Sequence, residues 1–317
     1  MVTKTNKISN DAVAKKKSLR TEIWKNRYLY ALLAPGMICL ILFRYFPIAW
    51  LTIAFKDYKL LKGMDGSEWV GFKHFIEFFQ STDCFMIIKN TFVLSAYGIL
   101  FDFPATILFA LMLNEIRNIH FKKAVQTITY LPHFISTVVL VGLVNTMLTS
   151  VPPGAVFKVL SGIFGMEGAI LGKEQYFRPI YVISSIWQQT GWSAIVYIAA
   201  LAGIDPTYYE AAVIDGAGRI KQLIHITIPC IMGTIVLMLI LKIGNILSIG
   251  FEKAFLMQTD TTRQVSEIIS TYVYKKGLAN KNYSYATAVG LFNSVIGFAL
   301  VVSANKFSKK VSEYGLW

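Results

Sequence analysis

Long apolar blocks separated by shorter polar segments run through the whole chain. A helix needs about 20 residues to cross the roughly 30 Å hydrocarbon core of a bilayer. Six blocks are long enough, at residues 28–55, 87–113, 125–149, 180–203, 226–250 and 284–305. A backbone in lipid must satisfy its own hydrogen bonds, and the chain lacks the alternating pattern of a membrane barrel. The pattern therefore predicts an all-α membrane protein with six transmembrane helices.

The composition agrees with a membrane protein and argues against nucleic-acid binding. Hydrophobic residues make up 55% and charged residues 15% of the chain, whereas about a quarter of a typical soluble domain is charged. The net charge of +13 could suggest nucleic acid, but many of the lysines and arginines lie in the two tails. No compact surface of basic and aromatic residues can be recognised.

Basic residues also predict the orientation of the helices. The polar and basic residues 1–27, the loop 117–123, Arg219 with Lys221, and the tail 306–310 fall on one side of a six-span chain. Lys and Arg are enriched on the cytoplasmic side, so both termini are expected there. We expect residues 1–27 to form a cytoplasmic tail and residues 28–317 a single transmembrane domain in the cell membrane.

A short polar stretch, residues 204–229, separates the fourth and fifth blocks. Asp205 can cap a helix whose first turn holds Pro206. That helix is expected to run to about Ile214, and Gly216 can end it by adopting a left-handed conformation. A second short helix follows, so the stretch predicts a cytoplasmic helix-turn-helix elbow.

The elbow carries a recognisable motif. Glu210-Ala211-Ala212, then Asp215-Gly216-Ala217, then Ile226-Thr227-Ile228-Pro229 resemble the EAA signature of the inner-membrane permease subunits of ABC importers. The resemblance covers nearly the whole chain and points to LplB-type polysaccharide and oligosaccharide permeases, which have the MetI-like type I importer fold. Further matching stretches are Ala54–Tyr58, Leu113–Arg117, Tyr130–Ser136, Ile186–Gln188 with Gly191-Trp192, and Gly250–Lys253.

The resemblance implies that the elbow is a coupling helix seated in a groove of a cytoplasmic ATPase. The coupling residues would be Glu210, Ala211, Ala212, Asp215, Gly216, Ala217 and Pro229. It also implies three kinds of partner: a second, homologous permease, two copies of the ATPase, and an extracytoplasmic solute-binding protein. ATP and Mg²⁺ would bind to the ATPase and no cofactor to this chain, which has no GxxxxGK[ST] loop to hold phosphates.

A sugar pathway needs groups that match both the polar edges and the apolar ring faces of an oligosaccharide. Candidates in or beside the spans are Gln188, Trp192, Asn245, Glu252 and Asp102. Charges within a span are costly and are functional candidates by default. For Asp102, packing against a polar partner and lining the pathway remain equally open, whereas Lys242 is expected to face a cavity or to be paired.

These observations predict a permease subunit of a binding-protein-dependent ABC importer of oligosaccharides derived from complex polysaccharides. It is predicted not to be an enzyme. One alternative is a secondary sugar transporter, for which Asp102 and Lys242 are the only coupling-ion groups to offer. Another is a membrane-embedded polysaccharide-processing enzyme. The four histidines and three cysteines lack metal-ligand spacing, and no Ser/His/Asp set is suggested.

Overall fold

The structure is a computed structural model of the 317-residue chain, and it describes residues 24–165, 168, 170–245 and 250–312. Contacts within the chain divide it into two parts, Met1–Thr52 and Ile53–Trp317, and each is described by itself. Most of the predicted basic tail, residues 1–23, lies outside the described residues. The division into that tail and one transmembrane domain stays a prediction.

The described residues of the first part form one mostly apolar helical segment. It consists of α2 (Arg27–Leu40), the π-helical turn η1 (Ile41–Tyr45) and the beginning of the 3₁₀ segment η2 (Phe46–Phe55). None of the 14 residues of α2, all of them described, is buried within this chain. An apolar helix without a buried face needs lipid or another protein around it.

The second part is helical except for one small hairpin. Strand β1 (Lys56–Asp57) pairs with β2 (Glu68–Trp69) in antiparallel register, which is a minor departure from the all-α prediction. The elements up to the elbow are α3 (Lys73–Gln80), α4 (Cys84–Tyr97), η3 (Gly98–Asp102), α5 (Phe103–Glu115), α6 (Ile119–Tyr130), η4 (Leu131–Phe134), α7 (Thr137–Leu148), α8 (Ala155–Phe164), η5 (Ile170–Gly172) and α9 (Glu174–Ala202).

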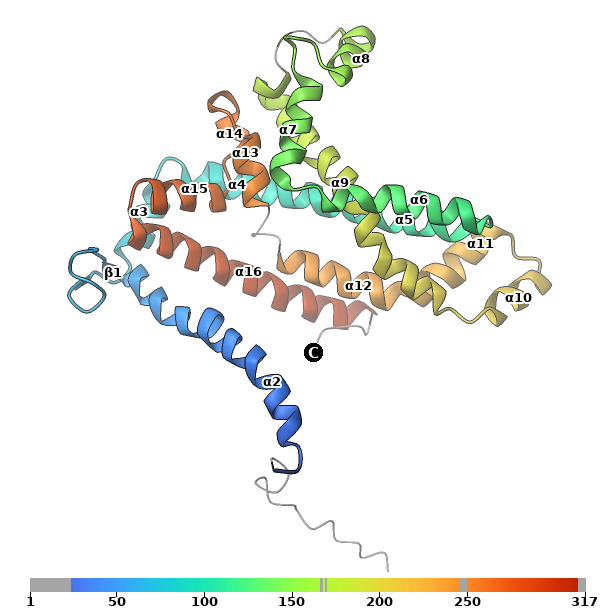
Figure 1. Cartoon of the computed structure of the whole chain (residues 1–317), viewed down its shortest axis with the longest axis horizontal. Coiled ribbons are helices and arrows are strands. Elements are labelled where there is room, and N and C mark those ends of the chain that lie inside the picture. The colour runs from blue at the N-terminus through green and yellow to red at the C-terminus, as the bar shows by residue number, and fades with distance from the viewer. Residues whose placement is uncertain (1–23, 166–167, 169, 246–249, 313–317) are drawn as a thin grey trace, which may run out of the picture. The chain divides into compact units, whose positions relative to one another are not determined.

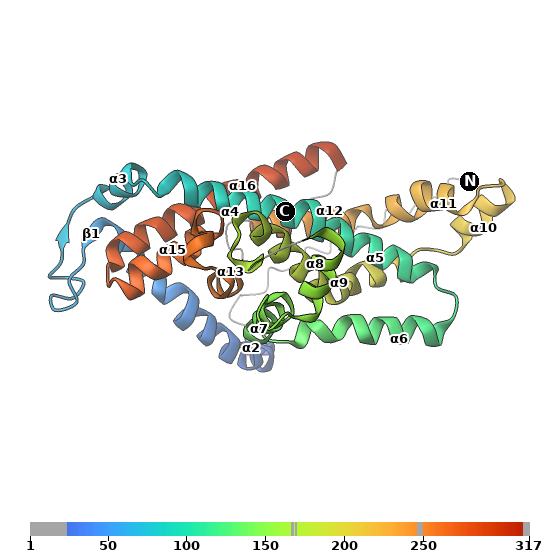
Figure 2. The same ribbon diagram turned by 90° about the horizontal axis from the view of Figure 1, so that it is seen from above.

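The elbow and the C-terminal helices complete the second part. These elements are α10 (Thr207–Ile214), α11 (Arg219–Gln222), η6 (Leu223–Thr227), α12 (Ile228–Gly244), α13 (Phe251–Met257), η7 (Asp260–Thr262), α14 (Arg263–Ser266), α15 (Ile269–Tyr274), η8 (Lys275–Ala279) and α16 (Tyr283–Ser312). In Figure 1, α12 and α16 run side by side, and Figure 2 shows α4 and α5 as one continuous path.

Helices α5, α9 and α12 are held together by a buried apolar cluster. Its fully buried members include Ala110 on α5, Ala194 and Tyr197 on α9, and Ile231 on α12. Small residues such as the two alanines let neighbouring helices in a membrane approach closely. The elbow between α9 and α12 is therefore attached to a well-packed base.

The third predicted span is not one straight helix. The segment Ile119–Phe134 and α7 meet at an angle of 101°. Pro132 is the second residue of the 3₁₀ turn η4, and Ile135 and Ser136 are extended. The Ser136 hydroxyl then accepts a hydrogen bond from the Val139 N–H and starts α7 in its new direction.

Four helices among the described residues are long and apolar enough to cross a membrane: Arg27–Phe55, Cys84–Glu115, Arg219–Gly244 and Tyr283–Lys310. The bent pair raises the number to five if it forms one span. The fourth predicted span corresponds to α9, which has 29 residues but carries Glu174 and Arg178 in its first turns. The helical membrane fold is confirmed, and the count of six stays a prediction.

Three of the long helices contain a π-helical turn placed before a proline. Turns η1, η3 and η6 end two residues before Pro47, Pro104 and Pro229, respectively. Proline lacks an N–H group and its ring clashes with the carbonyl four residues earlier. A π turn widens the helix at this point, so the chain can pass the proline without ending the span.

Candidate functional site

The elbow begins and ends as the sequence predicts. The Asp205 Oδ1 atom accepts a hydrogen bond of 2.9 Å from the Thr207 N–H, and this bond lowers the pKa of the Asp205 carboxyl. At the other end of α10, Gly216 has a φ of 74°, in the left-handed region that favours glycine. The Ala217 N–H then donates to the Ala212 carbonyl over 2.8 Å and closes the helix end.

Side-chain hydrogen bonds attach α10 to the second arm of the elbow. That arm runs from α11 through η6 into α12 as one helix, Arg219–Gly244. The Tyr209 hydroxyl lies 2.9 Å from the Thr227 hydroxyl, and Gln222 Nε2 donates to the Ala217 carbonyl over 2.8 Å. Movement of α10 is thereby connected directly to α12.

The outer surface of the elbow is apolar and uncovered. Ile214 is 86% exposed and Ile220 74% exposed. Tyr208, Val213 and Ile224 are also exposed, and Glu210 and Asp215 add charge beside them. Figure 1 shows α10 and α11 at one end of the second part. A contiguous exposed apolar patch with a polar rim is typical of a protein interface.

A cavity of about 400 Å³ lies between α5, α9 and α12. Asp102, Trp192 and Asn245 line it together with Lys242. The Lys242 ammonium group pairs with the Asp102 carboxylate across 140 positions of sequence. Asp102 therefore has a charged partner and also lines a cavity, and its place on the sugar pathway stays a prediction.

A smaller cavity of about 170 Å³ continues from the same ion pair. Asp102 and Lys242 line it together with Tyr181 and Ser185 of α9. Lys253 reaches this region from α13, and its Nζ donates to the Tyr181 carbonyl over 2.9 Å and to the Ser185 hydroxyl over 2.7 Å. Its ammonium group also lies 4.7 Å from the centre of the Tyr181 ring.

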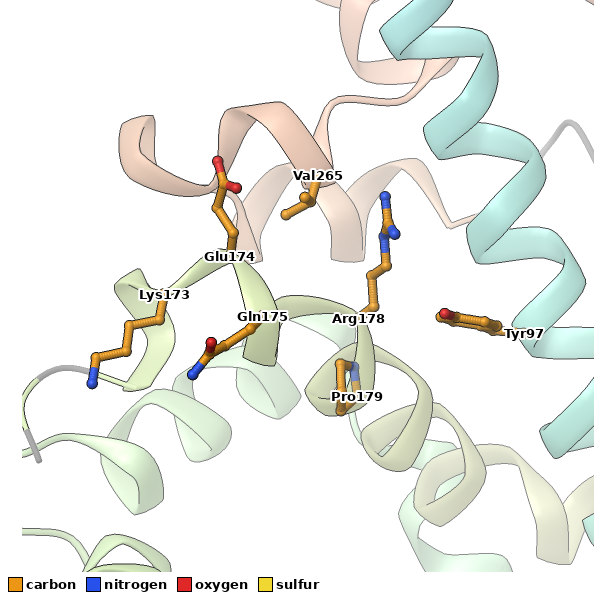
Figure 3. Close-up of a pocket in the computed structure, with 7 residues that line it drawn as sticks. All are labelled: Tyr97, Lys173, Glu174, Gln175, Arg178, Pro179 and Val265. Atoms are coloured by element: carbon orange, nitrogen blue, oxygen red, sulfur yellow. The ribbon is translucent and has the colours of Figure 1, made fainter. Parts of the chain in front are cut away.

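A third and larger cavity, about 670 Å³, lies near the start of α9 (Figure 3). Tyr97 and Arg178 line this cavity. Gly98 and Ser185, further along the same two helical paths, line the 170 Å³ cavity. Thr106 and Trp192, further still, line the 400 Å³ cavity. The lining residues thus advance in the same order along α4–η3–α5 and along α9. The three cavities form a row beside these two helices.

Comparison with known proteins agrees with the elbow and the helical core. Residues 102–313, more than half of the chain, match the model of a family described as "Binding-protein-dependent transport system inner membrane component". The chain belongs to this family. The permease is 46% identical over 303 residues to the polygalacturonan/rhamnogalacturonan transport system permease protein YteP of Bacillus subtilis, covering 96% of this chain and 94% of YteP.

Another relative and a solved structure extend the likeness. The protein LplB of Bacillus subtilis is 43% identical over 293 residues, covering 92% of each chain. A chain in the crystal structure of a bacterial alginate ABC transporter, solved with an alginate pentasaccharide-bound periplasmic protein, superimposes with a TM-score of 0.86. That chain is 42% identical, and the match covers 94% of the permease and 99% of its counterpart.

Family membership confirms the predicted class of protein. The chain is a membrane permease of an ABC importer and not an enzyme, and ATP hydrolysis belongs to a separate ATPase subunit. The predicted importer-permease fold is confirmed by the same comparisons. The roles of individual residues are not tested by them and stay predictions.

The structure brings some of the predicted pathway residues together and separates others. Asp102, Trp192 and Asn245 share one cavity. Gln188 is only 7% exposed, and its Nε2 donates to the Ile135 carbonyl over 3.0 Å, so it secures the bend before α7. Glu252 is exposed on α13 and lines none of the three cavities.

Trp192 is oriented by His133, one of the four histidines that lack metal-ligand spacing in the sequence. The rings of His133 and Trp192 stack with centroids 4.6 Å apart and planes 1° apart. His133 Nδ1 lies 2.9 Å from Gln189 Oε1, which fixes the histidine ring in turn. Trp192 therefore offers a positioned aromatic surface beside the cavity.

Sequence reasoning missed Arg178, Lys253 and Tyr181. Their positions near the ends of apolar blocks gave a weak signal, since Lys and Arg commonly occur there. Where each of these side chains lies depends on how α9 packs against α4 and α13. That packing cannot be read from the spacing of residues along the chain.

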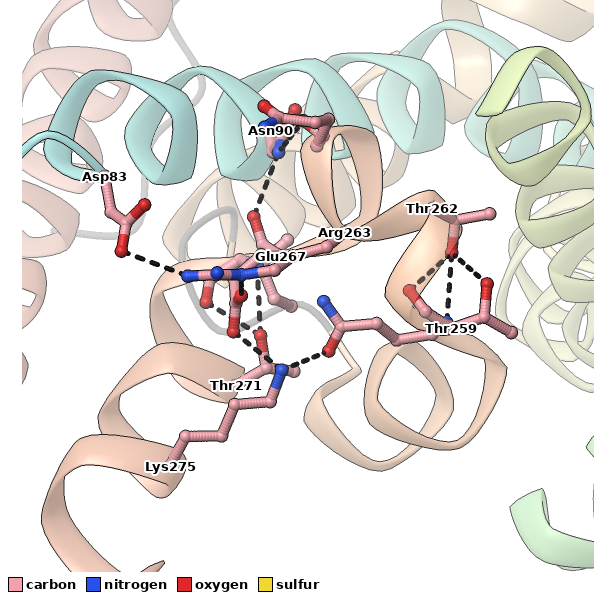
Figure 4. A network of polar contacts seen from close by, with 11 residues as sticks. Asp83, Asn90, Thr259, Thr262, Arg263, Glu267, Thr271 and Lys275 are labelled. Carbon is pink, nitrogen blue, oxygen red and sulfur yellow. Dashed lines mark hydrogen bonds and ion pairs between the residues drawn. The ribbon is translucent and has the colours of Figure 1, made fainter. Parts of the chain in front are cut away.

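A charged network holds the short helices after α13 against α4 (Figure 4). Glu267, 1% exposed, accepts a hydrogen bond of 2.6 Å from Arg263 Nε and lies 2.9 Å from Lys275 Nζ. Arg263 also pairs with Asp83 over 3.0 Å. The hydrogen bond that Arg263 donates to Glu267 is the main cause that raises the pKa of Arg263. Val265, which lies between Arg263 and Glu267 in the sequence, lines the 670 Å³ cavity.

Proposed function

We propose that this permease takes up oligosaccharides derived from complex polysaccharides or glycans. The names of its relatives support the substrate class: YteP is named for polygalacturonan and rhamnogalacturonan, and the solved transporter for alginate. The lining of the 400 Å³ cavity has the chemistry for a sugar, with the Trp192 ring for an apolar face and Asn245 and Asp102 for hydroxyl groups. The proposal therefore assigns these three residues to the pathway.

The elbow is proposed as the site that receives force from the ATPase. Its coupling residues are Glu210, Ala211, Ala212, Asp215, Gly216, Ala217 and Pro229. The observation that carries this proposal is a capped elbow, bonded to α12 through Tyr209 and Thr227, whose apolar outer surface is uncovered. A rigid element attached to two spans can convert closure of the ATPase dimer into movement of those spans.

The partners follow from the same proposal. A second, homologous permease completes the pathway, two copies of the ATPase bind ATP and Mg²⁺, and an extracytoplasmic solute-binding protein delivers the sugar. The uncovered apolar surface of α2 is compatible with a permease partner or with lipid. The complex is placed in the bacterial cell membrane, with both termini and the elbow of this chain on the cytoplasmic side.

Alternating access links these parts into a transport cycle. With the ATPase subunits apart, the row of cavities would open toward the cytoplasm. ATP-driven closure would move the elbow and α12, and with α12 the lysine that pairs with Asp102. The pathway would then open toward the docked binding protein, and hydrolysis would reset it.

The proposal is tested with the four-component transporter reconstituted in proteoliposomes. Uptake of a labelled oligosaccharide should require ATP, the ATPase and the binding protein. Trp192→Ala and Asn245→Ala should lower uptake, whereas Leu61→Ala, at a fully exposed position outside the cavities, should not. Ion-driven uptake by the purified chain alone, or undiminished uptake in both cavity variants, would contradict it.

A further inference from the structure

Arg178 is a half-buried cation that no carboxylate neutralises among the described residues. Among the described residues, Lys242, Arg263 and Lys275 each have an acidic partner within ion-pair distance. Arg178 has none there, and its one hydrogen bond runs from Nη2 to the neutral Asn90 Oδ1 over 2.9 Å. A partly buried charge without a counter-charge is costly, so its retention calls for an explanation.

Asn90 holds one side of the Arg178 guanidinium in place. Asn90, 1% exposed, donates from Nδ2 to the carbonyls of Gln264 and Glu267 over 2.8 and 3.1 Å. Those bonds orient the side-chain amide of Asn90 so that its Oδ1 atom faces Arg178. The Arg178 Nε atom is buried and has no hydrogen-bond partner among the described residues. The side chain is therefore anchored on one side and unsatisfied on another.

The cavity beside Arg178 has the size and chemistry for a sugar. Its volume of about 670 Å³ lies within the range of about 300–1,000 Å³ that is usual for ligand sites. Figure 3 shows Arg178 extending from α9, with Val265 on one side and the Tyr97 ring on the other. An aromatic ring can cover the apolar face of a sugar, and a guanidinium matches a carboxylate with two parallel hydrogen bonds.

The charge further along the row of cavities has the same sign. Beyond Arg178, the side chains of Lys253 and Lys242 approach this row, and Asp102 is the acid between them. Burial lowers the pKa of Lys253 to about 7, so this residue adds only a partial positive charge beside the Asp102–Lys242 pair. A partial positive excess next to α9 favours a negatively charged ligand over a neutral one.

We propose that Arg178 is a specificity residue that binds the carboxylate of an acidic oligosaccharide, with Tyr97 as the platform for the same sugar ring. The ligand class is a chain of uronate sugars, as opposed to neutral ones. This inference rests on the proposed function, because it assumes that the row of cavities lies on the sugar pathway.

The test compares acidic sugars with their neutral forms in the four-component transporter. The probes are a trigalacturonate and a trimannuronate, each paired with its carboxyl-reduced form. Uptake kinetics are measured for wild type, Arg178→Gln, Arg178→Lys and Tyr97→Leu. Lys158→Gln serves as the matched control, because it removes an exposed cation from α8, away from the cavity. Equilibrium binding to the complex in nanodiscs, without binding protein, excludes effects of sugar delivery.

Wild type should prefer an acidic probe over its neutral form. Arg178→Gln should raise the KM for the acidic probe about 10- to 100-fold, with the neutral form changed by less than about twofold, as expected for losing a hydrogen bond to a charged group. Arg178→Lys should lie between, since it keeps the charge but not the planar fork. Lys158→Gln should behave as wild type.

Several results would overturn the inference. Wild type could show no preference for the acidic probe over its neutral form. Arg178→Gln could keep the same preference as wild type, or it could lose affinity equally for the acidic and the neutral probe. Uptake of neutral oligosaccharides alone would remove this inference but leave the proposed function standing. No ATP-dependent uptake of any oligosaccharide would instead defeat the proposed function. If the transporter does not assemble with Arg178→Gln, the test uses Arg178→Lys and Tyr97→Leu. For each, the KM for the acidic probe is compared with the KM for the neutral probe.

Discussion

Asp102 at the end of η3 and Lys242 on α12 form an ion pair that connects two helices separated by 140 positions of sequence. Both side chains are mostly buried and border two of the three cavities. Because α12 continues from the elbow without a break, this pair is one charged contact between the elbow-bearing helix and the path of α4 and α5. Arg219 on α11 makes a second one with Glu115 at the end of α5, over 3.8 Å.

Asp102→Asn should destabilise the permease by leaving the Lys242 charge without its partner. We expect a loss of about 2 kcal/mol, less than the roughly 3–5 kcal/mol for a fully buried pair, because Lys242 keeps some solvent contact. Thermal unfolding of the complex in nanodiscs measures the loss. The double variant Asp102→Asn with Lys242→Met should recover part of it, and a double variant less stable than Asp102→Asn would contradict the pairing.

Gly216→Ala should weaken coupling, whereas Gly218→Ala should not. A residue with a side chain costs about 1–2 kcal/mol in the left-handed conformation that Gly216 adopts. Gly218 has an ordinary φ of −70° and open space where a Cβ would lie. Co-purification of the ATPase and ATP-dependent uptake should fall for the first variant alone. Equal effects of the two substitutions would show that the left-handed turn is not the cause.

Asp205→Ala should loosen the first turn of α10, and Asp205→Ser should restore it. The Asp205 pKa is lowered in the folded protein, so its capping contribution is complete above the ordinary value of about 3.9 and is lost as the pH falls through the lowered pKa. Hydrogen exchange at the Thr207 amide reports the cap near neutral pH. Unchanged exchange in Asp205→Ala would refute the assignment.

Gly191→Ala should destabilise the contact between α6 and α9. A Cβ at this position would collide with the Thr129 backbone carbonyl, which cannot move aside as a side chain can. The expected cost is about 1–3 kcal/mol, as for other overpacked positions. Gly290→Ala on α16 is the control, because nothing lies near its Cβ position. Similar melting temperatures for the two variants would argue against close packing at Gly191.

Glu267→Gln should loosen the short helices after α13. The substitution leaves Arg263 and Lys275 without their shared buried carboxylate, at a cost of about 3 kcal/mol. Hydrogen exchange should increase over residues 259–275, with little change in the elbow. Glu68→Gln, which removes an exposed carboxylate from β2, provides the comparison. Exchange that increases evenly over the whole chain would contradict a local role for the network.

The elbow shows how far local sequence can be trusted in this protein. Asp205, Gly216 and the helix between them occur as predicted, because a cap, a left-handed glycine and a short helix depend on neighbours in sequence. The apolar blocks were equally informative, since a membrane helix must satisfy its backbone within its own length. The 101° bend before α7 was not foreseen, although Pro132 and Ser136 both lie there.

Sequence by itself determined the membrane class, the helical fold and the elbow with its start and stop. The EAA resemblance, which the family match bears out, determined the transport function. Tertiary structure decided which polar side chains meet: Asp102 with Lys242, Trp192 with His133, and Arg178 with Asn90. It also turned Gln188 away from the cavities and toward Ile135. The reason is physical: the rotation of one packed helix against another selects the facing side chains, and residue spacing within a single helix does not specify that rotation.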